Sequence, residues 1–437
     1  MENIPLKSVW SETATENPRP TLSGNIKTDV LIIGAGMAGI LTAWRLKKAG
    51  ISCVVAEAKT VGSGVTKNTT AKITAQHGII YDELIRQFGR EKSQMYYAAN
   101  SEAIAEYKAL ATKIPCDLEE KTAYVYSRNS NDRLMQEARA YEKLGIGFHI
   151  EKKVDLPFQN YGAIAIEKQA QFNPLKLIYG LSSKLDILEN TFVKAIDGNR
   201  AITENGIIEA KHIVLATHFP MINIPGLFFL KLYQHRSYVL AIENAQLLDG
   251  MYIDEQENGL SFRTYDNLLF VGGGGHKTGK EAEGFETLNK FIRENYSDAH
   301  IKYRWATQDC MTLDSVPYIG RHRASKQNLY VSTGFNKWGM TGAMVASKVL
   351  CDLITKGSNS YEELFSPSRS IMTKQLAVNV GSAAVGLFSI GGPRCTHMGC
   401  KLHKNEAERT WDCACHGSRF TEDGDVINNP AKRGINL

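Results

Sequence analysis

The most strongly patterned stretch of the chain predicts a strand, a glycine turn, a helix and a second strand. Residues 29–33 (DVLII) form a continuous apolar run, which is typical of a strand buried on both faces. The run leads into GAGMAG at residues 34–39, and residues 40–50 then place apolar side chains at helical spacing before a basic last turn and a glycine. A second apolar run, ISCVVAE, predicts the next strand and ends at Glu57.

Later stretches predict a second set of elements. The segment from Phe88 to Lys113 has the pattern of a helix, and the segment from Phe228 to Phe270 has the pattern of several strands. Residues 328–333 (NLYVST) predict one more strand, residues 334–339 a glycine-rich loop, and residues 340–354 a helix with a mostly apolar face. These elements suit an α/β fold with more than one layer.

The glycine motif with its flanking elements has the arrangement that binds a dinucleotide. Gly34 allows a tight turn, Gly36 lets the backbone approach a pyrophosphate, and Gly39 lets the helix pack closely on the strand. The start of the helix offers free N–H groups and a partial positive charge to the phosphates. Glu57 follows Gly34 by 23 positions, where a carboxylate can accept hydrogen bonds from ribose hydroxyls. A glycine turn without a ligand is the alternative, and the complete set of strand, helix and acid argues against it.

The fingerprint alone fits NAD or FAD. An extended loop rich in Gly, Ser and Thr follows Glu57 and suits a large ligand, which favours FAD. A second fingerprint, common in proteins that bind both FAD and NAD(P)H, is absent from the sequence. Residues 274–281 (GGHKTGKE) nearly match an ATP-binding loop, but Glu281 stands where Ser or Thr must hold magnesium, so ATP binding is rejected.

Composition excludes several classes of protein. The 437 residues are 43% hydrophobic and 22% charged, which is ordinary for a globular chain of more than one domain. A net charge of +5 without a basic run argues against nucleic-acid binding. The first 29 residues lack the apolar core of a secretory signal, and the longest uncharged stretch, residues 375–392, is broken by polar residues and glycines. We therefore expect a cytoplasmic protein without a membrane span.

Four of the eight cysteines crowd into residues 395–415, which indicates a local metal or redox site rather than a secreted disulfide scaffold. The spacing is Cys395-x-His397, fifteen residues, then Cys413-x-x-His416. Two thiolates and two imidazoles hold the irons of a Rieske [2Fe–2S] centre. A mononuclear zinc site is the competing interpretation, but zinc fingers usually pair Cys with Cys and His with His. Here each half supplies one of each, which favours the iron–sulfur cluster.

Four segments make the chain resemble the glycine-oxidase and D-amino-acid-oxidase-like family of FAD-dependent oxidoreductases. They are VLIIGAGMAG with VVAE, GSGVTKNTTAKITAQHG, HIVLAT and NLYVSTGFNKWGMTGAMVAS. The resemblance covers residues 29–364 and implies FAD, bound noncovalently because Cys310 is not where some relatives attach it. It also implies that adenine meets a strand containing Val193, and that the helix start at residues 339–341 faces the flavin pyrimidine edge. The residues that it places at FAD are Gly34, Gly36, Met37, Ala38, Gly39, Glu57, Ala58, Gly64, Thr69, Thr70, Val193, Thr217, Gly334, Gly339, Met340 and Thr341.

The same resemblance implies the domain organisation and a substrate residue. An FAD-dependent oxidoreductase domain over residues 1–365 would combine a Rossmann-like FAD-binding part (about 28–90, 165–225 and 305–365) with a mainly antiparallel α+β substrate subdomain (about 90–165 and 225–305). Arg263 is the candidate for gripping a substrate carboxylate, because a planar guanidinium can bond both oxygens. The segment WATQDCMTLDSVPYIG departs from the family by lacking its usual Arg. Weaker substrate candidates are Arg236, Tyr238, His276 and Trp338.

At the other end, CTHMGC and CACHGS resemble the two ligand boxes of Rieske proteins. The resemblance implies Cys395, His397, Cys413 and His416 as iron ligands. It also implies a disulfide between Cys400 and Cys415, as in the cytochrome-complex type. A linker at 366–390 would precede a small all-β Rieske domain at 391–437. That domain is shorter than usual, because only AVGLFSI (residues 384–390) suggests a strand before the first box.

Together these features predict an FAD-dependent oxidoreductase that oxidises the C–N bond of an amine or amino acid. Electrons would pass from the flavin to the [2Fe–2S] cluster and on to an unknown acceptor, since FAD takes two electrons and the cluster one. The alternative is an electron-transfer or redox-sensing module without an amine substrate of its own. A reductase fed by NAD(P)H is a third hypothesis, weakened by the missing second fingerprint.

Overall fold

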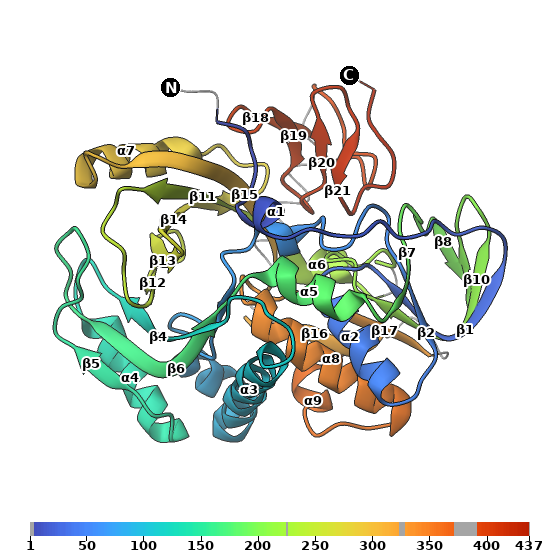
Figure 1. The fold of residues 1–437 in the computed structure, drawn as a ribbon, viewed down its shortest axis with the longest axis horizontal. Helices are drawn as coiled ribbons and strands as arrows, with labels where there is room; N and C mark the ends of the chain where they lie inside the picture. Colours follow the sequence, from blue (N-terminus) through green and yellow to red (C-terminus); the bar gives the residue numbers. More distant parts are fainter. Residues whose placement is uncertain (1–3, 224–225, 323–327, 371–390, 437) are drawn as a thin grey trace.

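The computed structural model describes residues 4–223, 226–322, 328–370 and 391–436. The predicted strand at residues 384–390 lies outside the described residues, as does the uncharged stretch at residues 375–392 except for its last two positions. Two large sheets and one small sheet make up the β structure, and Figure 1 shows them as separate layers with helices between and around them. Among the described residues, no helix is long and apolar enough to span a membrane.

The first large sheet contains the predicted β-α-β unit. Its strand order is β16-β17-β10-β1-β2-β7, and β1 pairs in parallel with β10 and β2. The carboxyl half of β1 is fully buried, as its continuous apolar run predicts, and α2 packs against α8 beside the sheet. These elements are β1 (Ile26–Ile33), α2 (Met37–Lys48), β2 (Cys53–Ala56), β10 (Ile207–Leu215), β17 (Leu329–Thr333) and α8 (Gly339–Thr355). The remaining strands are β7 (Asp186–Leu188), β8 (Ala195–Asp197), β9 (Arg200–Ile202) and β16 (Tyr318–Arg321).

The second large sheet is mainly antiparallel, in the order β15-β11-β14-β13-β12-β4-β6-β3, with β5 beside β6. Only the β12–β4 pair is parallel among its described pairings. Its strands are β3 (Lys72–Ile73), β4 (Glu119–Tyr126), β5 (His149–Glu151), β6 (Ala163–Gln171), β11 (Leu232–Glu243), β12 (Met251–Asp254), β13 (Ser261–Tyr265), β14 (Leu268–Lys277) and β15 (His300–Thr312). The interleaved α/β and antiparallel fold class is thereby confirmed.

The helices around this sheet include one that begins earlier than predicted. Helix α3 starts at Tyr81, seven residues before Phe88, and a positive φ of 79° at Gly89 interrupts it. The sequence pattern is therefore broken about two turns into the helix, which hides its true start. The helices of this region are α3 (Tyr81–Ala111), α4 (Asp132–Leu144) and α7 (Phe285–Asn295). Shorter helices are α1 (Trp10–Thr13), η1 (Val65–Asn68), α5 (Pro174–Ser182), α6 (Phe228–Lys231) and α9 (Glu362–Phe365).

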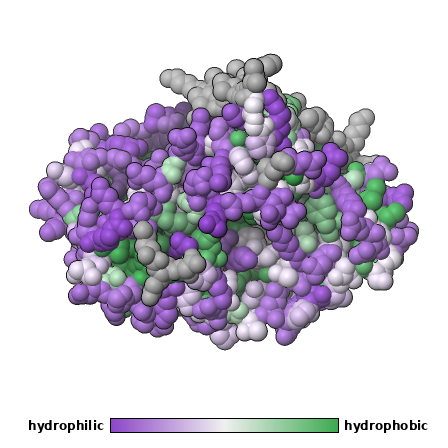
Figure 2. Space-filling view, turned by 90° about the horizontal axis from the view of Figure 1, so that it is seen from above, coloured by the Kyte–Doolittle hydropathy of each residue, from purple (hydrophilic) through white to green (hydrophobic). Residues whose placement is uncertain are grey.

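The C-terminal part forms the small antiparallel sheet β18-β19-β20-β21, drawn in red at the top of Figure 1. Its strands are β18 (Leu402–Asn405), β19 (Thr410–Cys413), β20 (Arg419–Thr421) and β21 (Val426–Asn428). A separate hydrophobic cluster centred on Phe420 and four cysteines forms its core. Seen from above in Figure 2, the molecule is mainly hydrophilic, with hydrophobic side chains gathered in recessed parts of the face. The all-β C-terminal region is confirmed by this sheet.

Candidate functional site

The carboxyl ends of four parallel strands bring the predicted FAD residues to one edge of the first sheet. Gly34 follows β1, Glu57 follows β2, Thr217 follows β10 and Gly334 follows β17. In open α/β sheets, ligands bind in the crevice outside these strand ends, where the strand order reverses. The strand that follows β1 in sequence, β2, lies on one side of it, and the later strands β10 and β17 lie on the other side. The strand order therefore reverses between β10 and β1, which places the crevice directly at the glycine motif.

The glycine motif has the geometry that only glycine allows at two of its positions. Gly34 has a φ of +108°, and a Cβ there would lie 2.5 Å from the carbonyl oxygen of Ala216. A Cβ on Gly39 would lie 1.9 Å from the carbonyl oxygen of Gly34. Gly36 is the N-cap of α2 and makes no side-chain cap bond, and the Met37 N–H donates to the Thr66 hydroxyl at 3.0 Å. The residues present therefore fit a pyrophosphate at this helix end.

Glu57 lies inside the crevice rather than on its rim. One carboxylate oxygen accepts a hydrogen bond from the Ala35 N–H at 2.8 Å, and the other accepts from the Lys59 N–H at 2.9 Å. Burial raises the pKa of Glu57 despite these bonds. A carboxylate has about four acceptor positions, so capacity for ribose hydroxyls remains. Ala58 follows in the same loop, whereas buried Val193 lies between β7 and β8, so the prediction of a strand at Val193 is wrong.

A buried histidine, His77, lies against the start of α8. His77 Nε2 lies 2.7 Å from the Thr74 carbonyl oxygen and 3.1 Å from Thr341 Oγ1, while its Nδ1 lies 2.8 Å from the Tyr96 hydroxyl. Its ring stacks on Trp338 with centroids 4.7 Å apart. Burial lowers the pKa of His77 to about 3, so the ring is neutral at pH 7. The only sequence signal for this role is that His77 closes the segment resembling the flavin-contacting loop.

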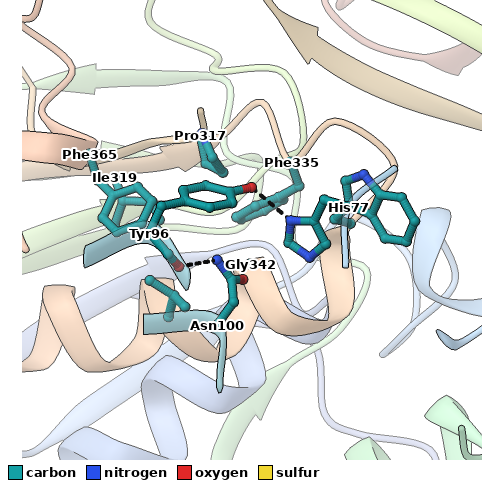
Figure 3. Close-up of a pocket in the computed structure, with 10 residues that line it drawn as sticks. His77, Tyr96, Asn100, Pro317, Ile319, Phe335, Gly342 and Phe365 are labelled. Atoms are coloured by element: carbon teal, nitrogen blue, oxygen red, sulfur yellow. Dashed lines mark hydrogen bonds between the residues drawn. The ribbon is translucent and has the colours of Figure 1, made fainter. Parts of the chain in front are cut away.

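A small pocket lies beside His77, between α3 and α8 (Figure 3). Tyr96 and Asn100 of α3 line one side, and the Asn100 side chain donates to the Tyr96 carbonyl oxygen at 2.9 Å. Phe335 and Gly342 line the opposite side. Helix α3 also contacts the start of α8 directly, because the Tyr107 hydroxyl donates to the Met340 carbonyl oxygen at 2.8 Å.

Arg263, the predicted substrate residue, makes contacts that point to another role. Its side chain is fully buried, and Nη1 donates to the carbonyl oxygens of Thr70 at 2.7 Å and Ala71 at 3.0 Å. The guanidinium lies over the rings of Trp10 and Phe270. Through Nη1 it thus bonds the backbone of the loop that carries Thr69 and Thr70, whereas its Nη2 is buried without a hydrogen-bond partner among the described residues. Sequence alone identified the strand but not the face on which Arg263 lies.

Strands β11 and β15 present two different faces. Arg236 and its cross-strand partner Gln308 contact the C-terminal domain: Arg236 Nε donates to Glu408 at 3.0 Å, and Gln308 Nε2 donates to the Gly417 carbonyl oxygen at 2.8 Å. Tyr238, a weaker substrate candidate, also faces this domain, since Asn405 donates to its hydroxyl at 3.4 Å. Its ring stacks on that of His276, the other weak candidate from this region.

The opposite face of the same strands carries charged residues that the sequence did not reveal. His235 and Asp309 are cross-strand partners there. Burial raises the pKa of Asp309 to about 6, with the charges of Lys337 and Arg236 opposing the rise. Burial and the nearby Lys337 charge lower the pKa of His235 to about 3, and its Nδ1 has no hydrogen-bond partner in the part of the chain that the structure describes. Lys337 directly precedes Trp338 and α8, so this face looks toward the predicted flavin edge.

The four predicted iron ligands converge in the C-terminal domain. The thiols of Cys395 and Cys413 hydrogen-bond to each other, and the rings of His397 and His416 lie 5.0 Å apart between centroids. Both Nδ1 atoms are buried without a hydrogen-bond partner among the described residues. Burial lowers the pKa of His397 to about 4 and of His416 to about 3, which keeps both rings in the neutral form that binds metal. This donor set fits an iron pair bound by two sulfurs and two nitrogens.

Two further cysteines lie beside the ligands. Cys400 and Cys415 are joined by a disulfide that connects the two ligand loops. The Cys413 thiol lies within 4.8 Å of both bonded sulfurs. That trio is not a metal site, because two of its sulfurs are already bonded to each other.

The histidine ligands point toward the first domain. His397 Nε2 hydrogen-bonds Asn223 Nδ2 at 3.1 Å, and His416 is 2% exposed with its ring beside Phe229. The Asn429 side chain donates to the Thr217 carbonyl oxygen at 2.7 Å, directly after β10. The ligand-bearing edge of the C-terminal domain is therefore covered by the domain that carries the glycine motif.

Comparison with known proteins gives the following matches. A model described as FAD dependent oxidoreductase matches residues 29–353, and a Rieske [2Fe-2S] domain model matches residues 366–436. A Bacillus subtilis protein named as a Rieske 2Fe-2S iron-sulfur protein, YhfW, is 34% identical over 489 aligned positions that span 97% of this chain and 96% of the relative. Gamma-glutamylputrescine oxidoreductase of Escherichia coli is 22% identical over 79% of this chain and 88% of its own. The structure of glycine oxidase from Geobacillus kaustophilus has a similar fold, with a TM-score of 0.67 and 20% identity over 79% of this chain and 99% of that chain.

Proposed function

The chain belongs to the FAD-dependent oxidoreductase family and carries a C-terminal Rieske [2Fe–2S] domain, and on this premise we propose that it oxidises the C–N bond of an amine or amino acid. Electrons then pass from FAD to the cluster and on to a one-electron acceptor. The relatives named as gamma-glutamylputrescine oxidoreductase and glycine oxidase support an amine or amino-acid substrate.

FAD and a [2Fe–2S] cluster can together accept the electrons that the proposed reaction releases. Bound FAD supplies a two-electron acceptor for the substrate hydride, and the cluster supplies a one-electron acceptor. The substrate loses a hydride from carbon and a proton from nitrogen, and the resulting imine reacts with water to give a carbonyl compound and an amine or ammonia. Two single-electron transfers return the cofactors to their oxidised states when the acceptor is present.

The observation that carries the proposal is the position of strands β11 and β15 between the two predicted cofactor sites. One face of the pair contacts Gly417, next to the iron ligand His416, through Gln308. The other face holds His235 and Asp309, which look toward Lys337 at the start of α8. Residues of this second face are placed to orient a charged amine or carboxylate.

Anaerobic reduction tests the proposal. Candidate amines and amino acids added to protein that holds both cofactors should bleach the flavin absorbance, and the electron paramagnetic resonance signal of a reduced cluster should follow. Reduction by NAD(P)H alone would instead support a reductase. A cluster that stays oxidised while the flavin is fully reduced would exclude internal electron transfer. If no amine bleaches the flavin, the chain has no amine substrate within the set tested and an electron-transfer module is favoured.

Two further parts of the hypothesis remain proposals. We propose domain boundaries near residues 365 and 391; the FAD-dependent oxidoreductase match ends at residue 353 and the Rieske match begins at residue 366. We also propose a cytoplasmic location, supported by buried, unpaired thiols at Cys53, Cys116, Cys310 and Cys351. Fractionation of cells that produce the protein, with separate assay of membrane and soluble fractions, would test this location.

A further inference from the structure

Five consecutive carbonyl oxygens, from Lys67 to Ala71, each accept a hydrogen bond from a side chain of another part of the chain. The donors are the hydroxyl of Ser8 to Lys67 at 2.5 Å, the indole of Trp305 to Asn68 at 3.0 Å, the indole of Trp10 to Thr69 at 2.7 Å, and Arg263 Nη1 to Thr70 at 2.7 Å and Ala71 at 3.0 Å. We call these four donor residues the loop clamp.

The clamp draws on three distant segments. Ser8 and Trp10 belong to the N-terminal segment, Arg263 to β13 and Trp305 to β15. All four side chains are at most 2% exposed. A buried donor without an acceptor destabilises a protein, so these N–H and O–H groups fix the loop carbonyls in place. Loops usually turn such carbonyls to water instead.

The clamp is one packed unit. The ring centroids of Trp10 and Phe270 lie 5.6 Å apart, and those of Phe270 and Trp305 lie 5.3 Å apart. The Arg263 guanidinium carbon lies 5.5 Å from the Trp10 ring centroid and 5.4 Å from that of Phe270. A cation over aromatic faces is attracted to them, and the same rings orient its N–H groups. Movement of one donor therefore disturbs the others.

The loop itself is held in a conformation that it would not keep alone. Ala71 has a φ of +56°, in the left-handed region that residues with a side chain rarely adopt. Its N–H donates to the Thr69 hydroxyl at 3.0 Å. Such a conformation persists when the surroundings determine it completely. With the carbonyls of residues 67–71 used by the clamp, the half-buried side chains of Thr69 and Thr70 remain for a ligand.

We propose that Ser8, Trp10, Arg263 and Trp305 are positioning residues for FAD: they hold the loop at residues 67–71 in the shape that contacts the flavin. This inference rests on the FAD-binding part of the proposed function, and it needs neither an amine substrate nor electron transfer to the cluster. It gives Arg263 a role at the flavin loop in place of a substrate carboxylate.

Release of FAD from the full-length holoprotein tests the clamp. Trp10→Phe and Trp305→Phe each keep an aromatic ring and remove only the indole N–H. Trp44→Phe on α2 is the matched control. The cations beside the Trp44 ring are Arg45 and Lys48, and neither belongs to the loop clamp. The rate of FAD release after dilution is followed by the recovery of free-flavin fluorescence, and the absorbance spectrum of bound flavin is recorded beforehand.

Release should be about tenfold faster in each clamp variant, which corresponds to about 1.4 kcal/mol, with a shifted flavin absorbance band and no change in the control. Arg263→Lys should release FAD faster still, since an ammonium cannot bond both carbonyls with fixed geometry. Parental release rates and spectra in both Trp variants would overturn the proposal, even if their thermal stability falls. Failure of every amine to reduce the flavin would instead affect the proposed substrate and leave this test unchanged.

Discussion

Replacing Arg236 with methionine is expected to loosen the contact between the Rieske domain and the substrate sheet. Arg236 and Glu408 form a bidentate ion pair across this interface, and their side chains are 3% and 8% exposed. Arg419 of the same domain also contacts Glu408, at 3.0 Å. Burial alone would raise the pKa of Glu408, but the charges of Arg236 and Arg419 outweigh it and lower the pKa. The carboxylate is therefore charged in the docked protein.

The magnitude follows from this geometry. Removing one partner of a buried ion pair costs about 3–5 kcal/mol, because the other charge stays buried without compensation. Arg419 remains beside Glu408 in the variant, so the lower limit of about 3 kcal/mol applies. At about 1.4 kcal/mol for each tenfold change, the docking equilibrium should shift by roughly 150-fold. The FAD-binding elements do not contact this pair and should be unaffected.

Stopped-flow absorbance and rapid-freeze paramagnetic resonance can separate the two steps. With a reducing amine in the absence of oxygen, Arg236→Met should bleach the flavin at the parental rate and reduce the cluster at least tenfold more slowly. Lys404→Met is the matched control, since its ion pair with Glu406 is exposed and such pairs contribute about 0–1 kcal/mol. Parental cluster reduction in Arg236→Met would refute the argument. The double variant Arg236→Met, Glu408→Gln should recover part of the rate, because no charge is then left unpaired at this position.

Other changes have equally definite outcomes. Burial and the Arg263 charge lower the pKa of Lys72 from 10.5 to about 7. Between these two pH values the unfolded chain still binds a proton that the folded protein has released, so the unfolding free energy should rise with pH across this window. Lys72→Met should flatten this rise in urea titrations. Gly39→Ala would place a Cβ 1.9 Å from the Gly34 carbonyl oxygen, so the variant should lose most of its FAD on gel filtration. The ratio of absorbance at 450 nm to that at 280 nm should then fall by roughly tenfold. His416→Ala should remove the iron signal and keep the flavin absorbance, and retention of a full iron content would contradict its role as a ligand.

The local parts of this molecule could be predicted from sequence because their signals lie within a few dozen residues. The glycine turn needs only its two strands and one helix to be identified, and the four candidate iron ligands follow from a spacing of Cys and His within residues 395–416. In both cases the chemistry depends on neighbours along the chain. Periodicity and spacing therefore carry most of the information.

The contacts between segments could not be predicted in the same way. Arg263 was correctly seen on a strand, but its partners at residues 70 and 71 lie more than 190 positions away. The pair Arg236–Glu408 spans 172 positions and has no periodic signature. Asp309 lies on β15 and Lys337 in the loop before α8, and their approach depends on how the two sheets meet. Such pairs are set by tertiary packing, which a single sequence does not display.

Side chains along β11 alternate between the two faces of the sheet, and this alternation has a consequence for anyone who wishes to redesign this protein. His235, a natural position at which to alter substrate preference, lies between Gln234 and Arg236, which contact Gly417 and Glu408. A bulky replacement that bends the strand would therefore disturb the neighbours that seat the iron–sulfur domain. Under the proposed function, selectivity and electron delivery would be coupled through one stretch of backbone, and libraries at residue 235 should be screened for both traits at once.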